Sequence, residues 1–422
     1  MTRASGRKRT PTRTTTRTPP TPTRTTPTRT PTPPTSGRAL ARCIEPVATE
    51  DFRDRYWERQ PLFVQRAEEG RFADLLSVAD VERLVCSGGL RFPGFRLVQA
   101  GAQIPLSQYA SDLPWRPSPF TGTADPGRVA EAFADGATTV LQALHHTWTP
   151  LAEFCRSLEA ELGHVAQANA YYTPAGSQGF GVHHDTHDVF CLQIAGEKRW
   201  RVYEPVLELP LKEQRYSADL GDHGEPVHDL TLEEGDTLYL PRGWLHEALT
   251  SDHHSLHVTV GVNVYTRLDA LRAAVESLAD DVELRRAAED DGELPNDLLA
   301  RLRERLDGAD VQRRRRKRFV STRRSVLPGQ LAEVRAMESL DTWIELERRP
   351  TVIADLAGTA LSFEGKTISF PEHARAELEA VCAAQEPFRA AELPGELDEP
   401  GRLVLVRRLI REGFLRRSAA GA

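Results

Sequence analysis

The chain has 422 residues, of which 40% are hydrophobic, so it is long enough for two or three domains that each bury an apolar core. Its five cysteines are odd in number and form no CxxC pair, which argues against a disulfide framework or a zinc cluster and favours a reducing, cytoplasmic setting. No run of about eighteen apolar residues exists and the N-terminus lacks the apolar core of a secretory signal, so we expect no membrane span.

The net charge of −7 conceals two regions of opposite sign. Residues 1–42 carry ten Lys or Arg residues and no acidic residue, so the rest of the chain carries −17. Residues 1–37 repeat Thr, Pro and Arg, which predicts a disordered basic tail that is either a solvated extension or a tether to an acidic surface such as RNA. An acidic body suits a basic protein partner better than a nucleic acid, because phosphate binding depends on Lys and Arg.

Ordered structure is expected from residue 38 onward. The segment 49–60 predicts a helix capped by Thr49 and stopped before Pro61. The segment 100–126 is rich in Gly, Pro, Ser and Asp and predicts a long irregular connection. The other predicted elements of this region are strands at 61–65, 95–99 and 137–144 and helices at 78–85 and 149–163.

The next predicted strand carries polar residues on one face. Asn169, Tyr171 and Thr173 are two residues apart and therefore point the same way. A polar face in a sheet either looks outward or lines a wet cavity, and both alternatives remain open at this point.

The segment 179–205 alternates as a strand and places His183 and Asp185 on one face. With His246 they would form the two-histidine, one-carboxylate triad that suits Fe(II) and leaves coordination positions open. The region is rich in histidine, so spacing alone leaves open that these residues bind no metal. The neighbouring histidines are His184, His187, His253, His254 and His257.

The third candidate ligand follows a recognisable pattern. Gly235 opens a turn into an apolar strand, which Pro241 ends. Gly243 then allows the backbone to turn His246 back toward the first two ligands.

A lysine stands on an otherwise apolar strand face. Gly196 and Glu197 predict a hairpin turn into a strand in which Lys198, Trp200 and Val202 share one face. Such a lysine must reach water or meet an anion, so Lys198 is either an exposed hairpin residue or an anion-binding group.

The sequence pattern changes from that of strands to that of helices after the strand predicted at 255–265. Amphipathic helices are expected at 268–288 and 297–307, separated by the polar segment 290–296. Their apolar stripes need a partner surface, either another subunit or the rest of the chain. The stripe residues are Leu268, Leu271, Val275, Leu278, Leu298, Leu299, Leu302 and Leu306.

The remaining segments predict contacts with proteins better than contacts with DNA. The run of arginine and lysine at 313–318 would suit a nucleic acid, and equally a solvated linker or an inter-subunit salt-bridge partner for the acidic helices. Residues 346–417 predict short strands and two helices, and hold eleven basic and twelve acidic residues, whereas a DNA-binding domain would be basic.

The spacing from Gly235 to His246 resembles the second motif of cupins. Together with His183 and Asp185 it resembles the JmjC branch of the 2-oxoglutarate oxygenases. Within that branch, the sequence from about Phe52 to the C-terminus is most similar to the ribosomal oxygenases, which hydroxylate side chains of ribosomal proteins. The segments that carry this resemblance are 169–185, 188–203, 238–248 and 255–261.

The resemblance implies a fold that is mainly β with α. It consists of a double-stranded β-helix, the cupin or JmjC barrel, at 38–267, a helical dimerisation region at 268–345 and a winged-helix domain at 346–422. It also implies Fe(II) as cofactor, 2-oxoglutarate as co-substrate and a homodimer. In the family, residues at the positions of Lys198, Asn169 and Tyr171 bind the co-substrate or lie near it. Gly261 stands where relatives often carry a hydroxyl residue, which leaves Thr259 or His257 as substitutes.

These observations predict an Fe(II)- and 2-oxoglutarate-dependent hydroxylase that acts on a histidyl or arginyl residue of a ribosomal protein. Two alternatives are another JmjC oxygenase, such as a lysine demethylase or a hydroxylase of a peptide or small molecule, and a cupin-fold binding protein without catalysis.

Overall fold

The computed structural model describes residue 1 and the ranges 39–87, 89–114, 116–178, 180–249, 252–287, 297–306, 308–350 and 352–418, with the backbone alone at 308–310. Apart from Met1, the predicted tail 1–37 lies outside the described residues, and so does the predicted polar segment 290–296. The elements below belong to the compact unit Pro34–Ala422.

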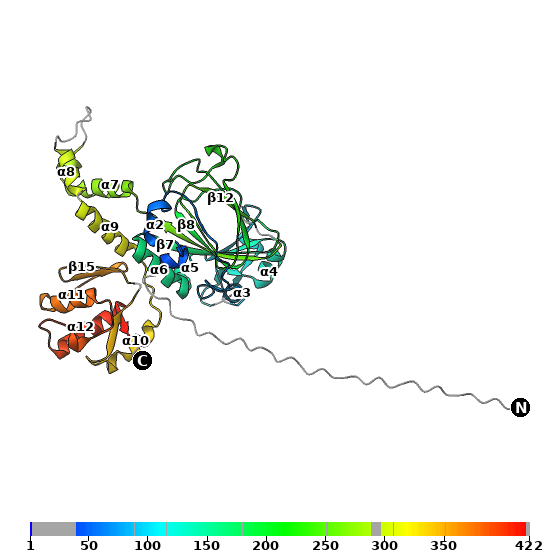
Figure 1. Ribbon diagram of the computed structural model, residues 1–422. Coiled ribbons are helices and arrows are strands. Elements are labelled where there is room, and N and C mark those ends of the chain that lie inside the picture. Colours follow the sequence, from blue (N-terminus) through cyan, green and yellow to red (C-terminus); the bar gives the residue numbers. More distant parts are fainter. Residues whose placement is uncertain are drawn as a thin grey trace. The chain divides into compact units, whose positions relative to one another are not determined.

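The largest sheet of the described residues has eight strands, and each neighbouring pair is antiparallel (Figure 1). The predicted strands around Asn169 and Thr259 are central, and their register places these two residues opposite each other. The order is β1 (Leu62–Val64), β11 (Thr237–Leu240), β8 (Asp188–Gly196), β13 (Ser255–Asn263), β7 (Val165–Thr173), β6 (Thr138–Leu141), β2 (Phe95–Gln99) and β3 (Ala102–Gln103).

Strand β8 is buried on both faces. One face carries Phe190, Leu192 and Ile194 into the main apolar core, and the other carries Val189 and Cys191 toward a second sheet. A strand that is covered on both faces needs a nearly continuous apolar run, which β8 has. The segment just before β8, which holds two predicted metal ligands, is therefore joined to a strand fixed on every side.

The second sheet contains β10 (His228–Leu232), β9 (Lys198–Tyr203) and β12 (Leu245–Leu249). The hairpin predicted at Gly196 is wrong, because β8 pairs with β11 and β13 whereas β9 pairs with β10 and β12. Gly196 instead lets the chain cross between sheets. Its φ is +63°, and a Cβ atom there would lie 1.9 Å from the carbonyl oxygen of His254.

Helices pack on the large sheet, with α5 (Leu144–Thr147) and α6 (Thr149–Leu162) against β7 (Figure 1). The predicted end of α6 at Gly163 is confirmed, with φ of +71°. The predicted cap at Thr49 is wrong, because Ala48 is the N-cap and Thr49 is already helical. The other helices of this region are α1 (Ala39–Ile44), α2 (Thr49–Arg55), α3 (Val78–Cys86) and α4 (Pro126–Ala134).

The segment 100–126 is more regular than predicted. It contains β4 (Ala110–Leu113) and β5 (Phe120–Ala124), which form a two-stranded antiparallel sheet. The Asp112 carboxylate accepts a hydrogen bond from the Gly122 N–H at 2.9 Å across this sheet. The prediction failed because it relied on Gly and Pro content, which marks turns and does not report the strands that they join.

Four helices follow the large sheet: α7 (Arg267–Glu276), α8 (Leu298–Arg305), α9 (Gly308–Thr322) and α10 (Gln330–Ala336). The run at 313–318 is helical and lies within α9. Arg315 donates to the carbonyl oxygen of Gly163 at 2.5 Å, and Arg316 pairs with Asp355 at 3.2 Å. These arginines are thus occupied within the chain.

The C-terminal segment has its own apolar core, which the predicted strands and helices build. Two three-stranded sheets have the orders β18-β14-β19 and β15-β16-β17. The bounds are β14 (Glu345–Arg348), β15 (Ala354–Ala357), β16 (Ala360–Phe363), β17 (Lys366–Ser369), α11 (Arg375–Ala383), β18 (Phe388–Arg389), α12 (Glu399–Arg411) and β19 (Leu415–Arg417).

The protein therefore has a mixed α and β fold, with one large antiparallel sheet and additional helical and small-sheet regions. All five cysteines lie within the described residues, and each of them is free. Among the helices of the described residues, none has the length and apolar character that crossing a membrane requires.

Candidate metal centre

The three predicted ligands meet where the segment before β8 touches β12. His183 and His246 exchange two backbone hydrogen bonds, with N···O distances of 3.1 and 2.8 Å. The prediction of a regular strand through the ligands is wrong at its start, because β8 begins only at Asp188. Asp185 therefore reaches the site from a loop, which Gly243 holds by donating its N–H to the Asp185 carbonyl oxygen at 3.1 Å.

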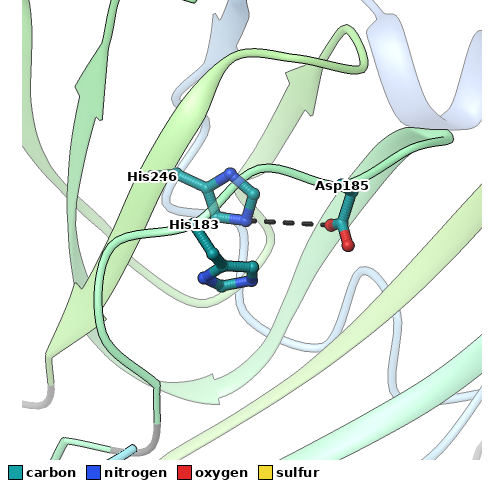
Figure 2. A group of neighbouring side chains, drawn as sticks. All are labelled: His183, Asp185 and His246. Carbon is teal, nitrogen blue, oxygen red and sulfur yellow. Dashed lines mark ion pairs between the residues drawn. The ribbon is translucent and has the colours of Figure 1, made fainter. Parts of the chain in front are cut away.

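Figure 2 shows the side chains of the three ligands turned toward one another. Their ligand atoms lie within 4.8 Å of one another, and Nε2 of His246 is 3.8 Å from Oδ2 of Asp185. Nδ1 of His183 donates to the Gly181 carbonyl oxygen at 2.8 Å, and Nδ1 of His246 donates to that of Trp244 at 3.1 Å. Each Nδ1 thus holds the ring hydrogen, which leaves Nε2 free to bind a metal.

The protonation states of the ligands also favour a metal. Burial lowers the pKa of His246 to about 4, helped by the neighbouring His183, so this ring is neutral at pH 7. Burial raises the pKa of Asp185, but His187, His246 and His183 outweigh burial and bring the pKa below its usual value. Two imidazoles and one carboxylate are the donor set that suits Fe(II) with open positions. The residues present therefore fit a ferrous ion.

The ligands open on a cavity of about 350 Å³ between the two sheets. All four residues predicted to contact the co-substrate line this cavity, so the polar face of β7 lines the cavity, as one of the two alternatives predicted. They are Lys198, Asn169, Tyr171 and Thr259. The other lining residues are Arg96, Thr138, Thr173, Phe180, His187, Val189, Cys191, Trp200, Ala248 and His257.

Lys198 lines the cavity and is buried, with 3% of its surface exposed. Its Nζ donates to Oγ1 of Thr173 at 3.3 Å, and we find no ion pair to Lys198 among the described residues. Burial lowers the pKa of Lys198 to about 7. A buried ammonium group with one hydroxyl partner is a site where an anion is strongly favoured.

The polar residues of the central strands are ordered by their neighbours. Oδ1 of Asn169 accepts from the Ala143 N–H at 3.0 Å. The Tyr171 ring stacks on His257 at 4.9 Å, and its hydroxyl is hydrogen-bonded to Thr259. Burial, followed by the Asp185 carboxylate, raises the pKa of Tyr171 to about 12, so this phenol stays protonated.

Sequence reasoning missed Arg96 and Phe180. The Arg96 guanidinium carbon lies 5.5 Å from the centroid of the Phe180 ring, and this ring contacts His183 at 5.9 Å. The alternation at 95–99 predicted the strand of Arg96 correctly. Nothing local indicated that this strand joins the sheet that forms the cavity.

Residues 142–269, which contain the three ligands, match the JmjC domain family. This segment of the chain is a JmjC domain. Over 220 residues the JmjC-domain protein is 37% identical to ribosomal oxygenase 1 of Gallus gallus, a match that covers 51% of this chain and 35% of that one. It is 32% identical over 283 residues to ribosomal oxygenase 1 of Homo sapiens, covering 63% of this chain and 41% of that one. The JmjC-domain protein is thus related to the ribosomal oxygenases while spanning less than half of these relatives.

Another relative is the bifunctional lysine-specific demethylase and histidyl-hydroxylase NO66 of Drosophila persimilis, 32% identical over 53% of the JmjC-domain protein and 31% of the relative. Among solved structures, the ribosomal oxygenase YcfD of Escherichia coli has a TM-score of 0.54 at 19% identity, and covers 88% of this chain and 98% of that one. YcfD has also been crystallised with cobalt and 2-oxoglutarate, with the same TM-score. The likeness to YcfD shows a shared fold.

Proposed function

We propose that this protein is an Fe(II)- and 2-oxoglutarate-dependent hydroxylase that modifies a histidyl or arginyl residue of a ribosomal protein. One observation carries the proposal: a triad of two histidines and one carboxylate opens on the same cavity as a buried lysine whose one hydrogen-bond partner among the described residues is the Thr173 hydroxyl. The relatives named ribosomal oxygenase and histidyl-hydroxylase support this choice of substrate class.

Each residue of the site has a distinct task in this proposal. Iron and 2-oxoglutarate, when bound, supply the activation of dioxygen and the transfer of one oxygen atom into a C–H bond. His183, Asp185 and His246 would hold the iron. Lys198, protonated by its contact with an anion, would pair with the far carboxylate of 2-oxoglutarate. The burial of this lysine keeps water away and strengthens the ion pair.

The central strands would keep the reacting groups in place. Because its Oδ1 is held by Ala143, Asn169 presents its NH₂ group to the cavity. The hydroxyls of Tyr171 and Thr259 form one fixed pair, and the stack on His257 prevents rotation of the phenol ring. Groups that are oriented before the substrate arrives lose little entropy on binding, which is how such a cavity favours one C–H position.

The proposal is tested by incubating the full chain with Fe(II), 2-oxoglutarate and ribosomal proteins in air. We expect stoichiometric succinate and a mass increase of one oxygen atom on a single ribosomal protein. Loss of a methyl group from a histone peptide would instead favour the demethylase activity that the name of the NO66 relative includes. Absence of any 2-oxoglutarate turnover would favour the binding protein without catalysis.

We also propose the finer division of the chain: a double-stranded β-helix barrel at 38–267, a helical dimerisation region at 268–345 and a winged-helix domain at 346–422. The separate apolar core of the last segment supports its independence. Its balanced charge supports contact with protein in place of nucleic acid. The five free cysteines agree with the proposed cytoplasmic location.

A homodimer formed through the helical region is the last part of the proposal. Within the chain, Leu271, Val275 and Leu299 remain 39%, 51% and 79% exposed. Apolar side chains that are grouped on neighbouring helices and left exposed mark a contact surface. A second copy of the chain would cover them by a two-fold, isologous interface.

A further inference from the structure

Gly261 lacks a side chain at the point where His187 packs against the sheet. A Cβ atom on Gly261 would lie 2.3 Å from Cδ2 and 2.5 Å from Nε2 of His187, and 3.2 Å from Cγ of Gln167. The φ angle of Gly261 lies outside the left-handed region, so backbone conformation does not require glycine here. The imidazole ring of His187 lies where a Cβ atom at this position would stand, so a larger residue requires the ring to move. His187 thus occupies the space that a hydroxyl-bearing residue at position 261 would fill.

His187 lies at the opposite end of the cavity from Lys198. On the paired strands β7 and β13, Gly261 faces Gln167, whereas Ser255 faces Thr173, the hydrogen-bond partner of Lys198. At about 3.3 Å per residue, Gln167 and Thr173 are roughly 20 Å apart along the strand. A dicarboxylate held by Lys198 therefore leaves the His187 end free for the substrate.

The groups at this end suit a neutral substrate side chain. Nε2 of His187 lies 3.4 Å from the amide nitrogen of Gln167, and the Asn169 amide is the next polar group along β7. Among the described residues that line the cavity, Asp185 is the only carboxylate, and the proposed metal would occupy it. Arg96 adds a positive charge to the same cavity. A guanidinium group would thus find a repelling cation and no free carboxylate.

We infer that His187, seated on Gly261 beside Gln167, is a specificity-determining residue that contacts the substrate side chain and selects a neutral hydrogen-bonding group, such as an imidazole or an amide, over a guanidinium group. This inference rests on the proposed function, since it assigns the end of the cavity that 2-oxoglutarate leaves open. It makes the proposed function more specific, because it selects a histidyl over an arginyl residue as the substrate.

The test measures binding without turnover, on the full chain loaded with Fe(II) and 2-oxoglutarate under argon. The probes are two acetylated nonapeptides with identical glycine and alanine flanks and a central histidine or arginine. We expect the histidyl peptide to bind about tenfold more tightly. His187→Leu should weaken this peptide alone by about three- to tenfold, the range of one hydrogen bond, and His187→Gln should recover most of the loss.

Control variants separate this contact from general damage. His373→Leu changes an exposed histidine of the C-terminal segment and should leave both affinities as they are. Equal affinities for the two peptides, no binding of either, or a His187→Leu variant that binds like the wild type would overturn the inference. Failure of the proposed function looks different: 2-oxoglutarate is not turned over in air, while the binding preference persists.

Thermal unfolding tests the placement of His187 without any ligand. Gly261→Ala should lower the unfolding midpoint in the wild type, because the added methyl group meets the imidazole ring. In a His187→Ala background the same change should lower the midpoint much less, since the ring is gone. Equal losses in the two backgrounds would show that His187 does not sit on Gly261.

Discussion

At the scale of single residues, the metal ligands contribute both affinity and geometry. We predict that Asp185→Ala or His183→Ala abolishes 2-oxoglutarate turnover, because two remaining ligands no longer define one face of the metal. Activity and cobalt binding are measured together at subsaturating metal. Asp252→Ala, which removes an exposed carboxylate, serves as the control. Full activity of either ligand variant would reject this site.

Lys198 offers a second prediction, in which stability and binding change in opposite directions. Replacing a buried amine that has no anionic partner among the described residues by an apolar side chain of similar length should stabilise the ligand-free protein at pH 7, by on the order of 1–3 kcal/mol. Lys198→Met should also weaken 2-oxoglutarate by roughly one to two powers of ten. Calorimetry with and without 2-oxoglutarate measures both effects. An unchanged affinity would assign the far carboxylate to another residue.

The same lysine predicts a pH dependence of stability. Its folded-state pKa of about 7 lies below its ordinary value of 10.5, so between these pH values the unfolded chain binds the additional proton. The contribution of Lys198 to the free energy of unfolding therefore rises with pH through this window. Denaturant titrations at pH 7 and pH 9 should show a smaller rise for Lys198→Met than for the wild type. Identical rises would contradict a buried, partly neutral lysine.

Single residues also show which features of the site the sequence could not predict. The strand period predicted that Lys198 and Trp200 share a buried face, because side chains two apart always do. It could not reveal that Lys198 has no anionic partner within the part of the chain that the structure describes, because that depends on every element around the cavity. Likewise, the sequence shows only that position 261 lacks a hydroxyl group. The structure shows that the ring of His187 occupies the space where that side chain would lie.

At the scale of elements, the pattern within one strand or helix predicted the structure of that element well. It did not predict which elements pair with one another. The bounds of α6 and the alternation in β7 and β13 follow from local periodicity and were confirmed. The prediction of a hairpin between β8 and β9 was wrong, because Gly196 permits a sharp turn equally well within one sheet or between two. The choice is made by the residues that cover both faces of β8, which lie far away in the sequence.

A buried carboxylate joins α6 to the segment after α9. Oε2 of Glu159 lies 2.7 Å from Arg323 and 3.1 Å from Arg156, and Oε1 accepts from the Ala166 N–H at 3.0 Å. We predict that Glu159→Ala lowers the free energy of unfolding by about 3–5 kcal/mol, because buried arginines lose their counter-ion. Denaturant titration measures the loss.

An exposed ion pair provides the matched control. Glu372 pairs with Arg375 at the surface, where the two side chains are 71% and 47% exposed. Glu372→Ala should therefore change stability by less than about 1 kcal/mol. If the two variants lost the same stability, the Glu159 cluster would not link the elements as strongly as its burial implies.

At the scale of the whole molecule, the helical region determines how copies of the chain could associate. The predicted stripe does not act as one surface, because Leu278 is only 7% exposed and packs within its own chain. Leu271 and Leu299 stay accessible on α7 and α8. A substitution that tests association must therefore spare Leu278, since a charge there would disrupt folding whether or not a dimer exists.

We predict that the full chain is a homodimer at micromolar concentration and that Leu271→Glu with Leu299→Glu converts it to a folded monomer. Two new carboxylates in each chain place four in the isologous interface of the dimer, and each would lose its hydration against an apolar surface. Light scattering gives the mass and circular dichroism the fold. Val404→Glu, at an exposed apolar position on α12, should leave the dimer intact. A wild-type mass of one chain would rule out the dimer, and a variant that remains dimeric and folded would place the interface outside α7 and α8.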